Sequence, residues 1–584
     1  MSDVRLSVHE WAEAFGRLSG GSTTELDLIA RNEDIAVGEL FIIPSLRGSQ
    51  RIFFFRAMDV ENLLRRVRDL GKVAGTLVVE GDSYLADLEQ EKILRVTGKL
   101  LGYVSKESKD RWIFERPRRL PEHLAVVYRT IPDKSAAHLR KLLEGQISGD
   151  VFLGQLLAGD TVLNVDVNLP KIGIPIHMGI FGTTGCGKSN FVLVLLKSLI
   201  DHNFRRRLEG KRARISMLAI DPHDEFALGI GKHGVQDMVE VLPEDARREL
   251  FHDFYYLTPF RQAVPKRIRR YAQEMRIAYS EILPVDIQSI VELSDQMMGY
   301  MHALEATHRG DWISQAGEDE LGRPAGTLAA VRRRLEFVKR SHIFVEDAAK
   351  STLSRIVEAL EQGRVLIFNT SLLSDLEQFL AVTVIARTMF ELRKALKSST
   401  KWEEFREQVK KRRLPWDFLE RFVPKPAEQF YVKGDGSARD PRDLPPVLVT
   451  IEEAPSILTP RIMRFENIYK DIARQGRKFG IGLAVISQQL TVLDNVILSQ
   501  LNTQINMALG NDEEIRAAVR NASEDISRFE REFRVLNRGE AIVTASYRDL
   551  PLVVKIPLFD DVFERDKDLY KQEAKATVSK DMEL

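Results

Sequence analysis

The sequence has a single cysteine, no long apolar run and no excess of charge of either sign. Its 584 residues include only Cys186, which excludes an internal disulfide framework and a cysteine-based zinc site. No stretch of about 18 or more apolar residues occurs, and the opening MSDVRLSVHEWAEAF lacks the basic-then-apolar pattern of a secretory signal. We therefore expect a cytoplasmic protein without a membrane segment.

The balanced charge of the chain gives no overall indication that it binds nucleic acid. Lys plus Arg and Asp plus Glu number 85 each, so the chain as a whole has no electrostatic signature of DNA binding. Any contact with DNA must come from local basic clusters. The densest are Arg205 to Arg207 with Lys211, Arg212 and Arg214, then Lys266 to Arg270, Arg332 to Arg334, and Lys410 to Arg413. A charge run is also compatible with a solvated face.

A chain of this length exceeds what one hydrophobic core organises, so two or three domains are expected. Residues 1–115 carry short β-branched and aromatic runs between turn residues, which predicts a β-barrel or sandwich. The predicted strands are Ile35 to Ile43, Arg51 to Phe55, Gly75 to Glu80 and Ile93 to Val104, with a helical period over Val60 to Leu70. Charged, proline-punctuated residues 116–149 predict a connector.

Residues 150–560 alternate strand and helix patterns, which predicts an α/β core with a mostly parallel sheet covered on both faces. Within it, helical spacing over Gln288 to His302, Leu328 to Phe337 and Ser351 to Leu360 predicts a helical insertion at about 235–360. Residues 397–444 are expected to form a surface excursion. Residues 561–584 form a charged tail that could brace a neighbouring subunit or remain loose.

A glycine-rich loop follows the apolar run Ile174 to Phe181 and precedes the apolar helical segment Asn190 to Leu199. Its residues are Gly182, Thr183, Thr184, Gly185, Cys186, Gly187, Lys188 and Ser189. Glycines let backbone N–H groups close around a phosphate, and the helix N-terminus adds a favourable dipole. This pattern predicts an ATP site in which Lys188 reaches the β- and γ-phosphates and Ser189 binds Mg²⁺, with Asn190 counted in the site.

Cys186 lies inside the loop, where a redox-sensing thiol is one reading. A small side chain that simply suits a tight loop is the simpler one, and we prefer it.

Two further strands end in polar residues suited to hydrolysis. Val447 to Ile451 ends in Glu452 and Glu453; we expect Glu452 to hold Mg²⁺ through water and Glu453 to orient and deprotonate the attacking water. Ile481 to Ile486 is followed by Gln488, a candidate sensor of the γ-phosphate. Solvated strand ends are the alternative for both.

Met217 to Ile220 ends in the segment DPHDEF, which begins at Asp221. Since ligands of open α/β sheets gather at the carboxyl ends of strands, these strand ends are expected to meet at one site.

Several of these motifs together resemble the HerA family. They are GTTGCGKSN, AIDPHDEF, VLVTIEEAP, ARQGRKFGIGLAVISQQ and ILSQLNTQINMAL, downstream of the predicted barrel, and the resemblance runs from about residue 20 to about residue 560. It implies a HAS-barrel, a RecA-like P-loop core and a helical insertion. It also implies a hexameric ring that uses ATP to translocate DNA with a nuclease partner, often NurA, or a ring that joins another effector in antiviral complexes.

A ring of this kind requires an arginine that reaches the neighbouring subunit, because oligomeric P-loop motors complete each ATP site with such a residue. The helix before Ile481 ends in RQGRK, with Arg474 and Arg477 three residues apart. The resemblance favours Arg477 as this finger and Arg474 as the second candidate. Simple complementation of the helix dipole is the alternative.

Two functions from different classes remain open. The first is a translocase that feeds duplex DNA, without sequence preference, to a partner nuclease. The second is an ATP-gated ring that organises an effector enzyme.

Overall fold

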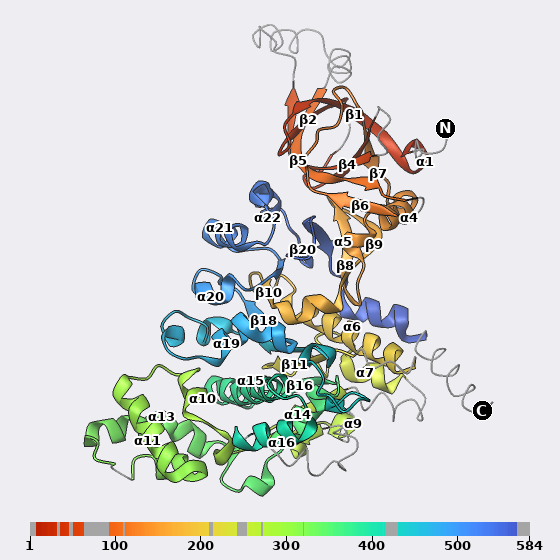
Figure 1. The fold of residues 1–584 in the computed structure, drawn as a ribbon. Helices are drawn as coiled ribbons and strands as arrows, with labels where there is room; N and C mark the ends of the chain where they lie inside the picture. Colours follow the sequence, from red (N-terminus) through yellow and green to blue (C-terminus); the bar gives the residue numbers. More distant parts are fainter. Residues whose placement is uncertain are drawn as a thin grey trace, which may run out of the picture. The chain divides into compact units, whose positions relative to one another are not determined.

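The computed structural model describes most of the chain (Figure 1). The described residues are 8–31, 35–45, 51–63, 93–108, 111–208, 214–241, 254–269, 272–318, 321–412, 414 and 430–568. They form two compact units. The first unit comprises Met1–Leu169, Gly182–Gly187 and Thr503–Pro557, and the second comprises Pro170–Phe181, Lys188–Asn502 and Leu558–Leu584. In the part of the chain described, no helix is long and apolar enough to cross a membrane.

The first unit contains the predicted barrel. Its strands are β1 (Ala12–Gly21), β2 (Leu26–Arg31), β3 (Leu40–Pro44), β4 (Arg51–Leu63), β5 (Ile93–Lys106) and β7 (Val126–Thr130). Each pairs antiparallel with its neighbour in the order β2-β1-β7-β3-β4-β5, and pairing of β2 with β5 closes the barrel. A further strand, β6 (Trp112–Glu115), pairs with β5.

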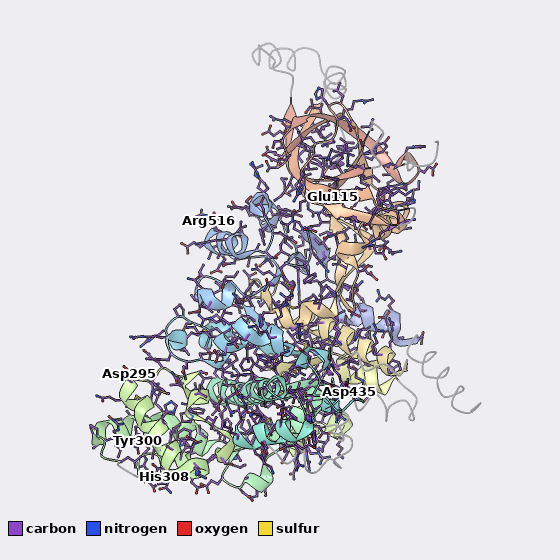
Figure 2. All side chains as sticks on the ribbon, viewed as in Figure 1. Glu115, Asp295, Tyr300, His308, Asp435 and Arg516 are labelled. Atoms are coloured by element: carbon purple, nitrogen blue, oxygen red, sulfur yellow. The ribbon has the colours of Figure 1, made fainter. Side chains whose placement is uncertain are left out.

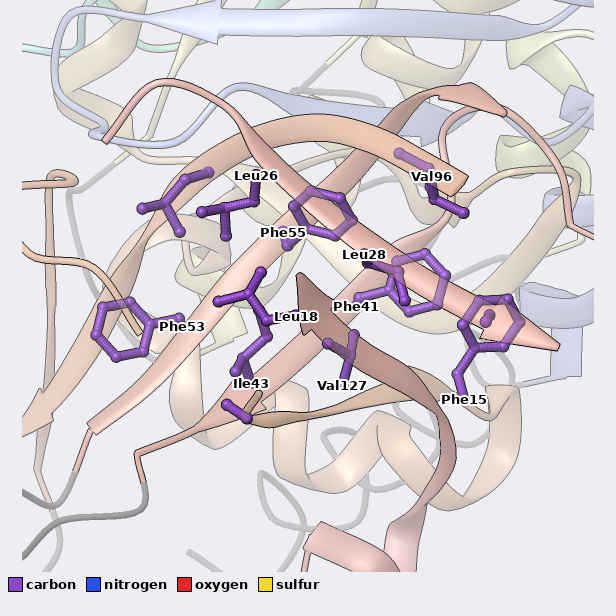
Figure 3. Close-up of a cluster of buried hydrophobic side chains, with 14 of the residues drawn as sticks. Phe15, Leu18, Leu26, Leu28, Phe41, Ile43, Phe53, Phe55, Val96 and Val127 are labelled. Carbon is purple, nitrogen blue, oxygen red and sulfur yellow. The ribbon is translucent and has the colours of Figure 1, made fainter. Parts of the chain in front are cut away.

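Alternate residues of these strands point inward and fill the barrel with aromatic and aliphatic side chains (Figure 3). Phe41 contacts Phe15 and Phe55, with ring centroids 4.9 and 5.8 Å apart. Leu28 and Val127, from two other strands, are fully buried in the same cluster. The barrel interior is therefore a packed core.

Two expectations for this region were wrong. The helical period begins inside β4, where Val60 pairs with Val96 through strand hydrogen bonds, so strand pairing prevails over helical spacing there. Residues 64–70 of that period and Gly75 to Glu80 lie outside the described residues. The segment expected to be a connector supplies β7, which lies between β1 and β3, and then α4 (Pro132–Leu142).

The first unit also contains an antiparallel sheet in the order β19-β20-β21-β8-β9. Its strands are β19 (Thr503–Asn506), β20 (Glu540–Ala545), β21 (Leu552–Lys555), β8 (Val151–Ala158) and β9 (Thr161–Leu169), and α21 (Asp512–Asn521) and α22 (Glu530–Phe533) lie between β19 and β20 along the chain. These segments were assigned to the α/β core, but they cluster with the barrel.

A buried ion pair joins the barrel to α22. Arg56 of β4 donates from Nε to Glu532 at 3.0 Å and from Nη1 to the carbonyl of Leu157 at 3.1 Å, and both charged side chains are almost fully buried. Arg116 and Asp549 form a second pair in this unit, at 2.8 Å, but both side chains are exposed.

Glu532→Ala is expected to destabilise the protein by about 3–5 kcal/mol, because it leaves the buried charge of Arg56 uncompensated. Asp549→Ala is the matched control and should change stability far less, since an exposed pair is screened by water. Thermal unfolding of the two variants against the parent chain measures the difference. Equal shifts in Tm would contradict the importance of burial at Arg56.

The second unit contains a parallel sheet in the order β13-β12-β16-β11-β17-β18-β10. Its strands are β10 (Met178–Phe181), β11 (Ser216–Asp221), β12 (Phe254–Thr258), β13 (Ala272–Glu274), β16 (Val365–Asn369), β17 (Val447–Ile451) and β18 (Ile481–Ser487). Its longer helices are α6 (Lys188–Leu208), α11 (Asp295–His308), α13 (Ala325–Arg340), α14 (Leu353–Glu361), α15 (Asp375–Lys397), α16 (Trp402–Lys411) and α19 (Ile468–Gln475). With the barrel, this sheet confirms the predicted fold class.

The interval between β11 and β16 was expected to be a helical insertion. Its helices α11, α13 and α14 are present, and Figure 2 labels Asp295 and His308 at the two ends of α11 and the buried Tyr300 between them. The interval also supplies β12 and β13, which extend the parallel sheet beyond β16. The expectation was therefore incomplete, because a short strand with few residues is hidden among stronger helical patterns.

Two smaller differences concern segment ends. Residues 174–176 belong to the 3₁₀ helix η1 (Lys171–Ile176) and not to the strand, which begins at Met178. Residues 397–444 are not wholly a surface excursion, since Trp402 and Phe405 of α16 are buried with Tyr431.

Candidate active site

The phosphate loop lies in the chain directly between β10 and α6, as the sequence predicts. Gly185 and Gly187 have φ values of 77° and 113°, a region that side chains disfavour and glycine adopts readily. A Cβ at Gly182 would lie 2.5 Å from the sulfur of Cys186, so a larger residue there would require the buried Cys186 to move. The loop therefore has the backbone conformation that its glycines suggested.

Cys186 is buried and packs within the first unit. Its sulfur lies 3.8 Å from that of Met507, and its carbonyl accepts the N–H of Gly539 at 2.9 Å. Thr183 donates its N–H to the carbonyl of Ala508 at 2.9 Å. A buried thiol in apolar surroundings behaves as a packing group, which agrees with the simpler of the two interpretations of Cys186.

Lys188 and Ser189 open α6, so their side chains lie at a helix N-terminus. Asn190 has a different contact: its Oδ1 accepts the N–H of Phe559 at 2.9 Å. That hydrogen bond joins α6 to the helical residues 559–568 at the end of the described chain. The side chain of Asn190 is thus engaged by the protein's own backbone.

The ends of four parallel strands lie at one edge of the sheet. In register, Phe181 of β10 pairs with Ser487 of β18, and Val485 of β18 pairs with Ile451 of β17. On the other side of β17, Leu218 of β11 pairs with Val449. The residues that follow these strands are consequently neighbours, as the sequence predicts for Glu452, Gln488 and the segment at Asp221.

Glu452 is the electrostatic centre of this edge. Burial, together with the neighbouring carboxylates of Asp221, Glu453 and Glu225, raises its pKa to about 8, although Lys188 acts in the opposite direction. Burial likewise raises the pKa of Asp221 to about 6. A concentration of partly buried carboxylates is unfavourable alone and is relieved by a divalent cation.

Glu453 stands in an unusual backbone conformation. Its φ and ψ are 47° and 42°, the left-handed helical region, which is costly for a residue with a side chain and is found where the surroundings impose it. Glu453 is exposed beside the partly buried Glu452. The strand end thus separates the two acids, one turned into the protein and the other available to solvent.

The segment after β11 is held by its own acids. Asp221 accepts the N–H groups of Glu225 and Phe226 at 2.9 and 2.8 Å. Asp224, with φ of 57°, accepts the hydroxyl of Tyr256 from β12 at 2.7 Å, and Asn369 of β16 donates to that hydroxyl at 2.6 Å. Sequence reasoning missed Tyr256 and Asn369, because nothing local marks them as neighbours of Asp224.

The two arginine candidates lie on the surface of the second unit. Arg474 is in the last turn of α19, and Arg477 is in the following 3₁₀ helix η9 (Gly476–Phe479). Both are exposed. The carbonyl of Arg477 accepts the N–H of Gly480. Within the described part of the chain, its guanidinium makes no hydrogen bond or ion pair, so this group is available to a partner outside the chain.

A parallel sheet whose edge carries a phosphate loop, a lysine and paired acids defines a P-loop ATPase with a RecA-like core. A divalent cation fits the donors present, since Ser189 supplies a hydroxyl and Glu452 a carboxylate that such a cation would relieve. Among the residues described, no group of three or more His, Cys, Asp or Glu forms a metal site by itself.

Comparison with known proteins confirms the resemblance to the HerA family. Residues 151–389 match the family described as the central domain of helicase HerA. The chain is 25% identical over 544 residues to the DNA double-strand break repair helicase HerA of Pyrococcus furiosus, which covers 91% of this chain and 89% of that protein. It is 23% identical over 568 residues to a probable helicase of Methanocaldococcus jannaschii, covering 93% and 95%. The chain is therefore similar to HerA helicases over most of its length.

Among solved structures, the plasmid coupling protein TrwB in complex with ADP and Mg²⁺ is similar, with a TM-score of 0.41 and 13% sequence identity. The similarity covers 74% of this chain and 92% of that chain.

Proposed function

We propose that this protein is a homo-hexameric motor that uses ATP and Mg²⁺ to move duplex DNA, without sequence preference, towards a partner nuclease. The observation that carries the proposal is the sheet edge that gathers Lys188, Glu452 and Glu453, next to strand β18 and Gln488. Turnover of ATP needs all of these, whereas ATP binding alone does not need an exposed acid such as Glu453. The similarity to relatives named as DNA repair helicases supports DNA as the substrate that the motor moves.

The roles at this edge follow from placement and chemistry. Residues 182–189 bind the phosphates, and Asn190 joins α6 to Phe559 through its hydrogen bond. Ser189 and Glu452 hold Mg²⁺, which supplies charge neutralisation on the phosphates when bound. Glu453 orients and deprotonates water, Gln488 reports the γ-phosphate, and Arg477 serves the site of the next subunit, with Arg474 as the second candidate.

Mg²⁺ dependence should vary with pH because of Glu452. With its pKa raised to about 8 by burial and by Asp221 and Glu453, the carboxyl is mostly protonated at neutral pH, and the cation must displace that proton. The Mg²⁺ concentration for half-maximal turnover should therefore rise as pH falls from about 8.5 to about 6.5, by at most about tenfold per unit.

The matched variant is Asp221→Asn, which keeps an oxygen for one of the two backbone N–H groups and removes a neighbouring charge that raises the pKa of Glu452. It should flatten the pH dependence relative to the parent protein. Identical pH profiles for the two proteins would contradict the coupling of Glu452 to the cation.

For DNA, the second unit offers one basic cluster without described partners. Arg332, Arg333 and Arg334 are exposed on α13. Elsewhere, Arg269 donates to the carbonyls of Gln262 and Val264, and Arg412 pairs with Glu391. Phosphate contact needs only accessible positive charge, so the α13 cluster is the favoured contact.

Duplex DNA is expected to raise ATP turnover several-fold, and the rise should fall steeply with salt because phosphate contacts release counterions. Replacing Arg332, Arg333 and Arg334 together by Gln should weaken this stimulation. Replacing Lys410 and Lys411 by Gln serves as the control, because it also removes positive charge but from a different basic cluster. If DNA left turnover unchanged while a partner protein raised it, the protein would instead be an ATP-gated scaffold for an effector enzyme.

A further inference from the structure

We infer that His177 is a positioning residue that ties the phosphate-loop strand of each subunit to the arginine finger which that subunit presents to its neighbour. The inference rests on the proposed role of Arg477. His177 immediately precedes β10, the strand that leads into the phosphate loop. It thus stands at the opposite end of β10 from the nucleotide.

His177 has two neighbours that belong to separate elements. Its Nδ1 accepts the N–H of Leu483 in β18 at 3.1 Å, and the backbone of Ala473 in α19 forms a hydrogen bond with the ring. The side chain is 2% exposed. Ala473 directly precedes Arg474 and lies one helical turn before Arg477. The ring therefore fixes the start of residues 474–477, here called the finger segment.

The backbone around the ring is constrained. His177 has φ of 64° and ψ of 143°, a conformation that a residue with a side chain adopts only when its surroundings enforce it. The burial that isolates the ring from water also lowers its pKa to about 4. The imidazole is therefore neutral at physiological pH, as an Nδ1 acceptor requires.

The finger segment is packed too tightly to move independently of this ring. A Cβ at Gly476 would lie 2.3 Å from the carbonyl oxygen of Ile481 and 3.3 Å from Cε1 of His177. On another side, the buried Arg393 of α15 donates to the carbonyls of Phe479 and Gly480 at 2.9 and 3.3 Å. A displacement of β10 is consequently passed to the segment that carries Arg477.

This arrangement connects two sites. β10 serves the subunit's own nucleotide, whereas Arg477 serves the nucleotide of the next subunit. Nucleotide binding at one site can thus set the position of the arginine finger at the next site. Sequential ATP hydrolysis around a ring requires such a connection. His177 itself touches neither nucleotide.

The test is subunit mixing with His177→Gly, since glycine accepts the positive φ and only the ring is lost. Rings of this variant alone should bind an ATP analogue within about twofold of the parent protein but turn ATP over at least about tenfold more slowly. Lys188→Ala subunits have an inactive site but an intact finger. In an equal mixture of the two, about a quarter of the interfaces combine a competent site with a competent finger, and turnover should reappear.

The reciprocal mixture decides where the residue acts. His177→Gly mixed with Arg477→Ala should stay inactive, because neither subunit offers a placed finger. Turnover in this mixture, or none in the mixture with Lys188→Ala, would place the role of His177 in its own site and overturn the inference.

Arg477→Ala mixed with Lys188→Ala is the reference for the finger itself. If that reference mixture stays inactive, the trans-acting finger is refuted and the coupling with it. If His177→Gly does not assemble, His177→Asn replaces it, because Asn tolerates positive φ and keeps an acceptor for Leu483 while losing the reach to Ala473. Loss of analogue binding in both variants would make His177 a folding residue.

Discussion

Glu453→Gln is expected to reduce ATP turnover by about 10²–10⁴-fold, because the amide cannot take a proton from the attacking water. The substitution keeps the size of the side chain and the left-handed backbone at φ of 47°. Binding of an ATP analogue should be unchanged, since the phosphate loop and Lys188 are untouched. Steady-state turnover and equilibrium binding, measured on the same preparation, separate these two effects.

Two control variants sharpen this prediction. Glu452→Gln removes the charge of the partly buried acid next to Glu453. It should raise the Mg²⁺ concentration needed for turnover, because the proposed role of Glu452 is to hold the cation. Glu318→Gln, an exposed acid in the helical insertion, should leave both measurements unchanged. If Glu453→Gln kept most of its turnover while Glu452→Gln lost it, the roles of the two acids would have to be exchanged.

The core of this site could be predicted from sequence because its signals are local. A strand followed by a glycine-rich loop and a helix fixes where Lys188 and Ser189 lie, and an apolar run ending in two acids fixes Glu452 and Glu453. Parallel strands align their carboxyl ends, so local patterns sufficed to bring these residues to one edge of the sheet. The structure adds the difference in burial between the two acids, which no pattern contains.

The parts that sequence missed depend on contacts between distant segments. β7 and β12 are short strands in intervals dominated by other patterns, and their sheet membership follows from pairing with β1, β3 and β16. His177 has no motif, because a lone histidine between apolar residues resembles any core histidine. Its place between Leu483 and Ala473 emerges only once β18 and α19 are packed beside β10.

Arg477→Ala is expected to lower turnover by about 10³–10⁵-fold, the range in which an arginine that stabilises the transferring phosphate acts. The side chain is exposed and, among the described residues, unpaired, so its removal leaves no buried partner behind. Rings should therefore persist, as judged by size-exclusion chromatography with light scattering, and each subunit should still bind nucleotide.

Arg474→Ala is the matched control, since it removes an equal charge in the last turn of α19 and should cost much less turnover. The reverse ranking would move the finger to Arg474. Because Arg474 directly follows Ala473, whose backbone meets His177, that outcome would preserve the coupling between sites and change only the side chain that delivers it. Loss of the ring in Arg477→Ala would instead make this arginine an assembly contact, and the charge that completes the site would have to come from another part of the neighbouring subunit.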